Sequence, residues 1–292
     1  MKELWQTIAN SIQIATVSTF DIQSIEAVRG GDINQSYRIQ DDSQVYFVKI
    51  HNSQNTDMFN KEVTGLNAIA DTNAIRVPKV ITTGNHAKHS FLVLEFIALS
   101  SVGNISDFAQ SLAKMHHSKK KQFGFNVDNY IGTTTQPNGW QDNWVVFYTE
   151  QRILHQLSLL RQKGAPLALL NIGETLAKNI SCFFENYVAT PSLIHGDLWQ
   201  GNYGFDAESN PVLYDPACYY SDHEAELAML ELFGKPGKNF FITYNNNFAI
   251  NAGYSDRKNL YNLYHILNHA NLFGGSYVSQ AESMIVHLLS KI

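Results

Sequence analysis

The stretch LIHGDLWQGN, residues 193–202, decides how the rest of this sequence is interpreted. An apolar run leads into a polar loop that is broken by glycine, and Asp197 and Asn202 stand in this loop. Taken alone, a His-Gly-Asp tripeptide predicts a turn whose aspartate caps a helix. The alternative is a catalytic loop in which the carboxylate and the amide have separate tasks. The choice depends on what the remainder of the chain supplies.

The bulk composition excludes several classes of protein. The chain has 292 residues, of which 44% are hydrophobic and 12% aromatic, so it can bury the core of one large domain or of two joined lobes. A net charge of -5, with one short lysine run at 119–121, argues against a nucleic-acid partner. No apolar run is long enough to predict a membrane span, and the N-terminus lacks the apolar core of a signal peptide. The two cysteines have neither metal-ligand nor disulfide-framework spacing, so we expect a reducing, cytoplasmic location. Nothing in the sequence indicates the oligomeric state.

The first third of the chain has the pattern of a small antiparallel sheet. Between residues 25 and 97 the runs SYRI, VYFVKI and FLVLEFI are rich in aromatic and β-branched residues and are separated by turn-forming residues. One helical segment, DMFNKEVTGLNAIA, interrupts them, and its apolar residues recur at helical spacing. This helix is expected to pack on the sheet.

The remainder of the chain has mainly helical patterns. We expect a helix over SDFAQSLAKMHH with Ser106 as its N-cap, a longer one from about 142 to 164, a third from about 172 to 187, and three more after residue 222. Short strand-like pieces, SLIH, YGF and PVLYD, surround the opening motif. We therefore predict two lobes, residues 1–98 and 99–292, with the boundary in the segment ALSSVG.

Two charged residues occupy positions where apolar residues are expected. Lys49 shares one face of its predicted strand with Val45 and Phe47, and Glu62 lies on the inward stripe of the helix that follows. Either residue alone has another interpretation, in which Lys49 reaches solvent at a sheet edge and Glu62 lies at the rim of its helix. Because an unpaired buried charge is costly, the two together predict an inward ion pair.

The opening motif now has a chemical interpretation. Phosphoryl transfer to a hydroxyl requires a carboxylate beside the attacking oxygen, ligands for Mg²⁺ and a cation on the nucleotide phosphates. Asp197 and Asn202 reproduce the Asp-x-x-x-x-Asn spacing of a kinase catalytic loop, and Asp215 follows a predicted strand as a second carboxylate for the metal. Upstream, Gly30 and Gly31 form a turn whose amides are able to close over phosphates, although such a pair alone predicts only a hairpin.

These residues and their flanking segments resemble the fructosamine kinase family, within the wider aminoglycoside phosphotransferase-like and protein-kinase-like enzymes. The resemblance rests on HGDLWQGN and YDPA, and GWQDNW and LNHANLFG narrow it further. It implies an α+β, two-lobed protein-kinase-like fold, with a small antiparallel β-sheet and one key helix in the N-terminal lobe and a larger, mainly helical C-terminal lobe. It also implies ATP and Mg²⁺ as cofactors. The implied acceptor is a sugar hydroxyl of a ketosamine of the fructosamine or ribulosamine type, free or protein-bound, and the implied role is repair by deglycation.

The resemblance assigns roles to individual residues. The catalytic base is Asp197, and the metal ligands are Asn202 and Asp215. The nucleotide side comprises Gly30, Gly31, Lys49, Glu62, Glu95, Phe96 and Ile97, of which the last three meet the adenine through their backbone. The acceptor side comprises Trp199, as a stacking wall two residues from the base, together with Asn268 and His269, which offer hydrogen-bonding groups to a sugar.

The sequence departs from the family pattern in one place and from protein kinases in another. Ser221, Asp222 and His223 stand where the family usually has Gly-His-Arg or Gly-His-Ser, so the local loop and the acceptor preference are expected to differ. Pro216 follows Asp215, which predicts an extended Asp215, and the short distance to the next helix predicts no activation loop.

Two other functions stay open at this point. One keeps the chemistry and changes the acceptor to an aminoglycoside or a choline-like alcohol. The other is a nucleotide-binding protein without catalysis on the same fold. The presence of Lys49, Asp197, Asn202 and Asp215 together favours an enzyme.

Overall fold

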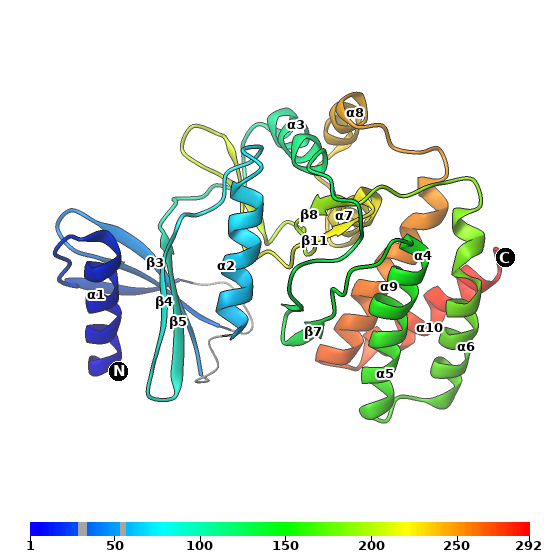
Figure 1. Ribbon diagram of the computed structural model, residues 1–292, viewed down its shortest axis with the longest axis horizontal. Coiled ribbons are helices and arrows are strands. Elements are labelled where there is room, and N and C mark those ends of the chain that lie inside the picture. The colour runs from blue at the N-terminus through cyan, green and yellow to red at the C-terminus, as the bar shows by residue number, and fades with distance from the viewer. Residues whose placement is uncertain (29–33, 53–56) are drawn as a thin grey trace.

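The computed structural model describes residues 1–28, 34–52 and 57–292. Figure 1 shows two lobes, a smaller one that carries the main sheet and a larger one built mainly of helices. The described part of the chain therefore has the expected α+β, two-lobed arrangement. The boundary at residue 98 stays a prediction.

The N-terminal lobe is a five-stranded antiparallel sheet, counted over the described residues, between two helices. Its strands, in the order β1-β2-β3-β5-β4, are Ser24–Val28, Gln35–Gln40, Val45–His51, His89–Glu95 and Val80–His86, and its helices are α1 (Lys2–Thr16) and α2 (Asp57–Ala70). Because side chains alternate along a strand, Tyr46, Val48 and Ile50 of β3 pack on the α1 side and Phe47 on the α2 side. Figure 1 shows α1 and α2 on opposite faces of the sheet. Lys49 consequently faces α2.

The C-terminal lobe is organised around the helix α9 (Tyr254–Phe273). Its other helices are α3 (Ile105–His116), α4 (Trp144–Tyr148), α5 (His155–Gln162), α6 (Leu167–Asn179), α7 (His223–Leu232), α8 (Lys238–Asn247) and α10 (Ser276–Leu289), with a π-helical turn, Thr149–Leu154, and a 3₁₀ turn, Ile180–Phe184. Three two-stranded ribbons join β6 (Asn129–Ile131) to β7 (Thr134–Gln136), β8 (Ser192–Ile194) to β11 (Tyr219–Ser221), and β9 (Tyr203–Phe205) to β10 (Pro211–Leu213).

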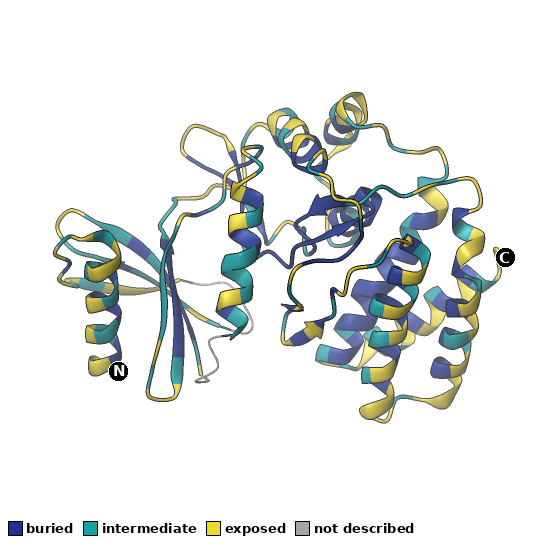
Figure 2. Ribbon diagram, viewed as in Figure 1, coloured by how far each residue is buried: buried dark blue, intermediate teal, exposed yellow. Residues whose placement is uncertain are grey.

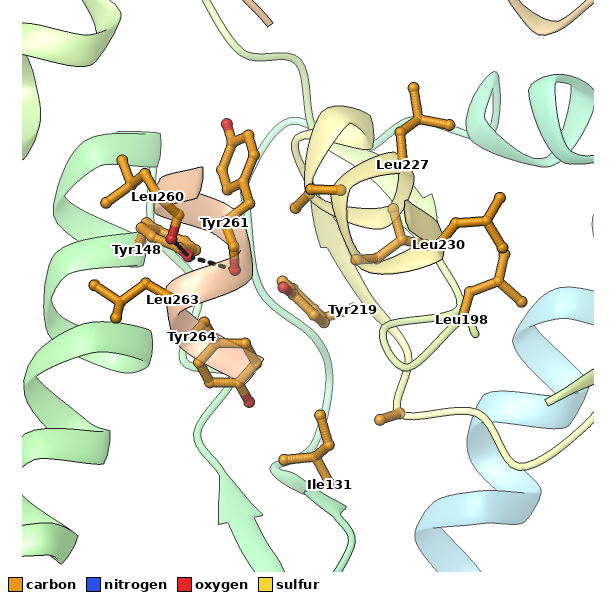
Figure 3. Packing of buried hydrophobic residues seen from close by; sticks show 14 of the residues in the cluster. Ile131, Tyr148, Leu198, Tyr219, Leu227, Leu230, Leu260, Tyr261, Leu263 and Tyr264 are labelled. Carbon is orange, nitrogen blue, oxygen red and sulfur yellow. Dashed lines mark hydrogen bonds between the residues drawn. The ribbon is translucent and has the colours of Figure 1, made fainter. Parts of the chain in front are cut away.

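The main core lies in this larger lobe. Figure 2 shows α7 and the inner face of α9 as buried. Figure 3 shows Tyr148 beside α9, where its hydroxyl donates to the carbonyl oxygens of Leu260, at 2.9 Å, and Tyr261, at 3.2 Å. None of the described helices is long and apolar enough to cross a membrane.

Several element predictions require correction. Asn104, not Ser106, caps α3, because its side-chain oxygen accepts from the amides of Ser106 and Asp107. The helix expected over 142–164 is α4, a π-helical turn and α5 in succession, and the helix expected over 172–187 begins at Leu167 and ends in a 3₁₀ turn. Strands β4, β6, β7 and β11 and helix α8 were not predicted. In β4 and α8, VITTGNH and KNFFITYNNN have too many polar residues for a clear period.

Candidate active site

Strand β3 and helix α2 bring Lys49 and Glu62 together. The lysine Nζ lies 2.7 Å from Glu62 Oε1, and it also contacts the Asp215 carboxylate, so the predicted inward ion pair is confirmed. The lysine is 5% exposed. Burial alone would lower the pKa of its amine, but the carboxylates of Asp215 and Glu62 more than reverse this, and the pKa lies above the usual range. Lys49 is therefore a permanent, oriented cation.

The opening motif forms a loop between β8 and β9. No helix begins at Asp197, so the interpretation as a capping turn is wrong. The side-chain amide of Asn202 donates to the backbone oxygen of Asp197 at 2.8 Å and to its Oδ2 at 3.1 Å. The Asp197 carboxyl remains partly accessible from the cleft, yet surrounding protein and then the negative charge of Asp215 raise its pKa to about 8. Such a pKa suits a group that exchanges protons near neutral pH.

Glu226 on α7 holds this loop through its backbone amides. Its buried carboxylate accepts from the backbone amides of His195, at 3.0 Å, and Gly196, at 2.8 Å, and it lies 3.0 Å from His116 Nε2. His195 itself points its Nε2 at the carbonyl oxygen of Tyr214, 2.8 Å away, so that ring nitrogen is the donor. His195 therefore joins this loop to the residue before Asp215 and positions it.

The segment around Asp215 is held against the same loop. The amide of Ala217 donates to the carbonyl oxygen of His195 at 2.8 Å. Asp215 has φ +59°, in the left-handed region, so the expectation of an extended conformation is wrong. Aspartate tolerates this region better than most residues. In this conformation the amide of Ala217 reaches the carbonyl oxygen of His195.

Helix α2 rests directly on this segment. A Cβ at Gly65 would lie 3.1 Å from Pro216 Cγ, and Cys218 Sγ donates to the Gly65 carbonyl oxygen at 3.6 Å. The helix that carries Glu62 is thus in contact with the residue after Asp215. No activation loop intervenes, because β11 follows three residues after Pro216 and α7 begins directly after the cap residue Asp222.

The donor set suits a magnesium ion. Because the amide nitrogen of Asn202 is engaged with Asp197, its Oδ1 is left as an oxygen donor in the same cleft as the Asp215 carboxylate. The described residues contain no cluster of three or more His, Cys, Asp or Glu that would form an all-protein metal cage. Mg²⁺ typically uses one or two protein carboxylates and completes its shell with substrate phosphates and water, so an asparagine and an aspartate fit it.

The residues expected to meet the adenine lie at the end of β5. The amide of Glu95 donates to the carbonyl oxygen of Lys79 at 2.8 Å, and its carboxylate lies 2.6 Å from Arg76. Within the described residues, the backbone groups of Phe96 and Ile97 make no hydrogen bond. They remain free to pair with a base. Gly30 and Gly31, expected to cover the phosphates, lie outside the described residues.

One cleft of about 750 Å³ collects most of the predicted site. Its lining includes Lys49, Glu62, Asp197, Trp199, Asn202, Asp215, Asn268 and His269, but not Glu95, Phe96 or Ile97. It also includes residues that the sequence analysis missed, namely Asn34, Met58, Asn129, Tyr130, Thr133, Met229, Phe233, Phe273 and Tyr277. For Glu226 a usable signal existed, because it is a charged residue within an apolar helix, as Glu62 is.

The residues that depart from the family pattern lie away from this cleft. Asp222 caps α7 through the amide of Glu224, at 3.1 Å, and also accepts from the hydroxyl of Tyr187 at 2.9 Å. His223 stacks on Phe248 with ring centroids 4.2 Å apart. Both are buried and neither lines the cleft, so the departure alters packing at the start of α7.

Known proteins resemble this chain over nearly its full length. A family model described as fructosamine kinase matches residues 4–291. A protein of Vibrio parahaemolyticus named "Probable ketoamine kinase" is 41% identical over 98% of this chain and 100% of its own length. A chloroplastic protein-ribulosamine 3-kinase of Arabidopsis thaliana is 42% identical over 90% of this chain and 82% of its own length. A crystal structure described as "Putative fructosamine-3-kinase" from Haemophilus somnus has a TM-score of 0.88 at 31% identity, covering 98% and 97% of the two chains.

The two lobes, the paired Lys49 and Glu62, and the loop that carries Asp197 are those of a kinase-like phosphotransferase. A solved aminoglycoside phosphotransferase, 14% identical, has the same fold with a TM-score of 0.66. The chain belongs to the fructosamine kinase family. It is therefore a kinase, an enzyme that takes its phosphoryl group from ATP.

Proposed function

We propose that this enzyme uses Mg-ATP to phosphorylate a sugar hydroxyl of ketosamines, either small molecules or glycated protein side chains. The observation that carries the proposal is the cleft in which Asp197 lies beside the oxygen donors Asn202 and Asp215, with Lys49 at the same end. The names of the relatives, ketoamine kinase and protein-ribulosamine 3-kinase, support the acceptor class. Phosphorylation of such an adduct is a step towards its removal from the amine, so the role is repair by deglycation.

The residues divide the work as follows. Lys49, oriented by Glu62, binds the nucleotide phosphates, and the backbone of Phe96 and Ile97 binds the adenine. Asn202 and Asp215 hold Mg²⁺, which when bound neutralises charge on the transferring phosphate. In this structure Lys49 contacts the Asp215 carboxylate, so nucleotide binding requires Lys49 to exchange that contact for a phosphate.

Asp197 acts as the general base that accepts the proton of the acceptor hydroxyl. Its carboxylate takes the hydroxyl proton as the acceptor oxygen forms a bond to the γ-phosphorus, and the bond from that phosphorus to the bridging oxygen of ADP breaks. The amide of Asn202 keeps the carboxylate in place by donating to it. Trp199, Asn268 and His269 then contact the acceptor.

An ATP-consumption assay with Mg²⁺ tests the acceptor. Fructosyl, ribulosyl and erythrulosyl amines are compared with aminoglycosides and choline, and the phosphorylated product is identified by mass spectrometry. Turnover of at least one ketosamine, well above the other acceptors, is expected. Turnover of an aminoglycoside or choline without any ketosamine would reject the proposed acceptor, and nucleotide binding without turnover of any acceptor would favour a non-catalytic binding protein.

We also propose that the enzyme works in a reducing compartment such as the cytoplasm. Cys182 is exposed and Cys218 is buried, and both are free thiols. An exposed thiol more readily stays reduced in a compartment where glutathione and thioredoxin prevent its oxidation. Fractionation of the source cells, followed by immunoblotting, tests this location.

A further inference from the structure

The acceptor end of the cleft is lined by two groups of residues with different chemistry. The first is polar and comes largely from the β6–β7 hairpin, where Thr133 is exposed, whereas the side chains of Asn129 and Tyr130 already bond to Cys218 and Asp57. The second is a set of rings from the end of α7, from α9 and from α10, which we call the ring wall: Phe233, His269, Phe273 and Tyr277.

The ring wall is continuous, and its inner end contacts Trp199 of the loop that carries Asp197. Trp199, two residues from Asp197, has its ring centroid 6.2 Å from that of Phe233, and Phe233 lies 5.0 Å from His269. His269 in turn contacts Phe273 at 5.5 Å and Tyr277 at 5.0 Å. The series of rings therefore runs from the reacting end of the cleft to α10.

The outer end of the ring wall is open to solvent. Phe273 is 56% exposed although it lies in a helix that is otherwise largely buried. Because Phe273 also lines the cleft, its exposed ring is accessible to a ligand bound there.

The ring wall carries no charge at neutral pH. Burial lowers the pKa of His269, and its Nδ1 lies 2.7 Å from the carbonyl oxygen of His265 and so donates to it. In that tautomer Nε2 is an acceptor, and it makes no hydrogen bond with the described residues. The carboxylates in the described lining, Glu62, Asp197 and Asp215, belong to the phosphoryl-transfer end.

We propose that the ring wall binds the substituted amine of the acceptor, while Thr133 of the polar hairpin receives a sugar hydroxyl. This proposal rests on the proposed function, because it concerns the orientation of a ketosamine in the same cleft. The protonated nitrogen lies against ring faces and near His269 Nε2, and its organic substituent extends along Phe273 and Tyr277 towards solvent.

The dimensions of a ketosamine agree with this orientation. The hydroxyl next to the carbonyl carbon is four bonds from the nitrogen, roughly 5 Å when extended. A hydroxyl at Asp197 thus places the nitrogen about one ring further along the wall. An ammonium group is attracted to aromatic faces without any carboxylate partner, and a flexible apolar substituent gains contact with the outer rings.

The proposal predicts selectivity for the amine rather than for the sugar. Three ketosamines with one sugar are compared, carrying N-methyl, N-benzyl and N-carboxymethyl groups. The N-benzyl compound is expected to have a kcat/KM about tenfold above that of the N-methyl compound, because its ring gains apolar contact, and the N-carboxymethyl compound is expected to be the poorest substrate.

Variants separate the ring wall from the remainder of the cleft. Tyr277→Ala is expected to reduce the ratio of kcat/KM for the N-benzyl compound to kcat/KM for the N-methyl compound (the benzyl-to-methyl ratio) about fivefold. Phe233→Leu keeps apolar volume but removes a π face, and it is expected to raise KM for all three ketosamines severalfold. Thr133→Ala, in the polar hairpin, is the matched control and leaves the benzyl-to-methyl ratio unchanged. The KM for Mg-ATP stays constant in all three variants. An unchanged ratio in Tyr277→Ala would overturn the proposal.

A binding measurement tests the ring wall without turnover. Titration of N-methylbenzylammonium chloride into the enzyme with Mg-ADP, followed by calorimetry, is expected to give binding that Phe233→Ala weakens about tenfold. No binding to the wild type, or equal binding to the variant, rejects the ring wall as an amine site. If this probe binds as expected and no ketosamine is phosphorylated, the proposed function fails and the amine site stands.

Discussion

Asp197, as the proposed base, is a residue at which catalysis and stability have opposite requirements. Burial and Asp215 raise its pKa from 3.8 to about 8, so the folded protein binds a proton there that the unfolded chain releases above pH 4. Its contribution to the free energy of unfolding is fully present below the unfolded pKa and is lost as the pH rises through about 8. The ionised base is therefore destabilising in the free enzyme.

Replacing this carboxylate should stabilise the protein while removing its activity. At pH 9, Asp197→Asn is expected to unfold about 2–4 °C above the wild type, and the difference should shrink towards pH 5, where both side chains are uncharged. Its kcat should fall at least about 10²-fold, because no base remains. Differential scanning calorimetry from pH 5 to 9 measures the first effect. A variant less stable than the wild type at pH 9 would contradict the assigned cause of the raised pKa.

The pH dependence of the wild type gives an independent measurement. In the free enzyme, kcat/KM should rise with pH as Asp197 ionises, with an acidic limb near 8 at low Mg²⁺. Because the charge of Asp215 contributes to the raised pKa, saturation with Mg²⁺ should move this limb to lower pH. An acidic limb that does not respond to Mg²⁺ would argue against Asp215 as a metal ligand.

At the residue scale, the sequence predicts best where a residue type conflicts with its position. Lys49 and Glu62 were recognised because charges stood on apolar faces, and the structure pairs them. Glu226 gives the same signal, yet its partners are backbone amides, which have no sequence signature. Phe233 and Tyr277 reach one wall only because three helices converge, so no local pattern identifies them.

At the scale of elements, the catalytic loop depends on one close backbone contact. Gly196 has φ +85°, and a Cβ there would lie 2.1 Å from the carbonyl oxygen of Ala217. This glycine therefore allows the loop after β8 and the segment after Asp215 to touch. The contact is independent of the charged groups that perform the chemistry.

Gly196→Ala should separate these two segments. It is expected to lower the free energy of unfolding by about 2–4 kcal/mol. The kcat of the variant should fall, whereas its KM for ATP should change less. Gly164→Ala is a matched control, because Gly164 also has a positive φ, +78°, but no atom lies within 4 Å of its added Cβ. The control isolates left-handed strain, about 1–2 kcal/mol. Equal losses of stability in urea denaturation would show that the close contact contributes nothing.

Long, strongly periodic elements were predictable, and their irregular ends were not. The helix of residues 57–70 was predicted with its observed bounds, Asp57–Ala70. The start of α6 at Leu167 follows from Pro166 and from packing against α10, and the π-helical turn between α4 and α5 has no periodic signal. Tertiary contacts determine such features, so a single sequence carries little information about them.

At the scale of the whole molecule, Arg76 connects the two lobes. Its guanidinium lies 2.6 Å from Glu95, at the end of β5, and 2.7 Å from Asp206, beyond β9. Its carbonyl oxygen accepts from the amide of Leu213 at 2.9 Å. The residue thus holds the end of the sheet near the ribbon that leads to Asp215.

Arg76→Ala should loosen this connection without unfolding either lobe. Because the Arg76 side chain is 41% exposed, and because Asp206 also accepts from the backbone amides of Glu208 and Asn210, a small effect is expected, with KM for Mg-ATP rising about threefold and Tm nearly unchanged. The wild-type KM should approach that of the variant at high salt. Arg161→Ala removes a comparable surface ion pair, 2.5 Å from Glu174, within the C-terminal lobe and should leave KM unaffected. An equal rise in both variants would reject a specific role for Arg76.

The order of motifs along the chain, together with the resemblance to a known family, was sufficient to predict the kinase-like fold. A sheet with one helix, then the loop with Asp197, then Asp215 occurs in the expected sequence, and the comparisons confirm both fold and family. The way the lobes meet was not predictable, because it depends on contacts such as Arg76 with Asp206, which are far apart in sequence.

The contact between α2 and Pro216 has a consequence for how the activity of this enzyme is regulated. With Gly65 packed on that proline, α2 has no room to approach further, and its outward movement would break the contact between Lys49 and Glu62. We expect the pair of Lys49 and Glu62 to be in place from the moment of folding. Purified enzyme should then work at its full rate without a lag or an activating partner. The rate of phosphorylation in the cell would then depend on the abundance of the enzyme and on the supply of substrate.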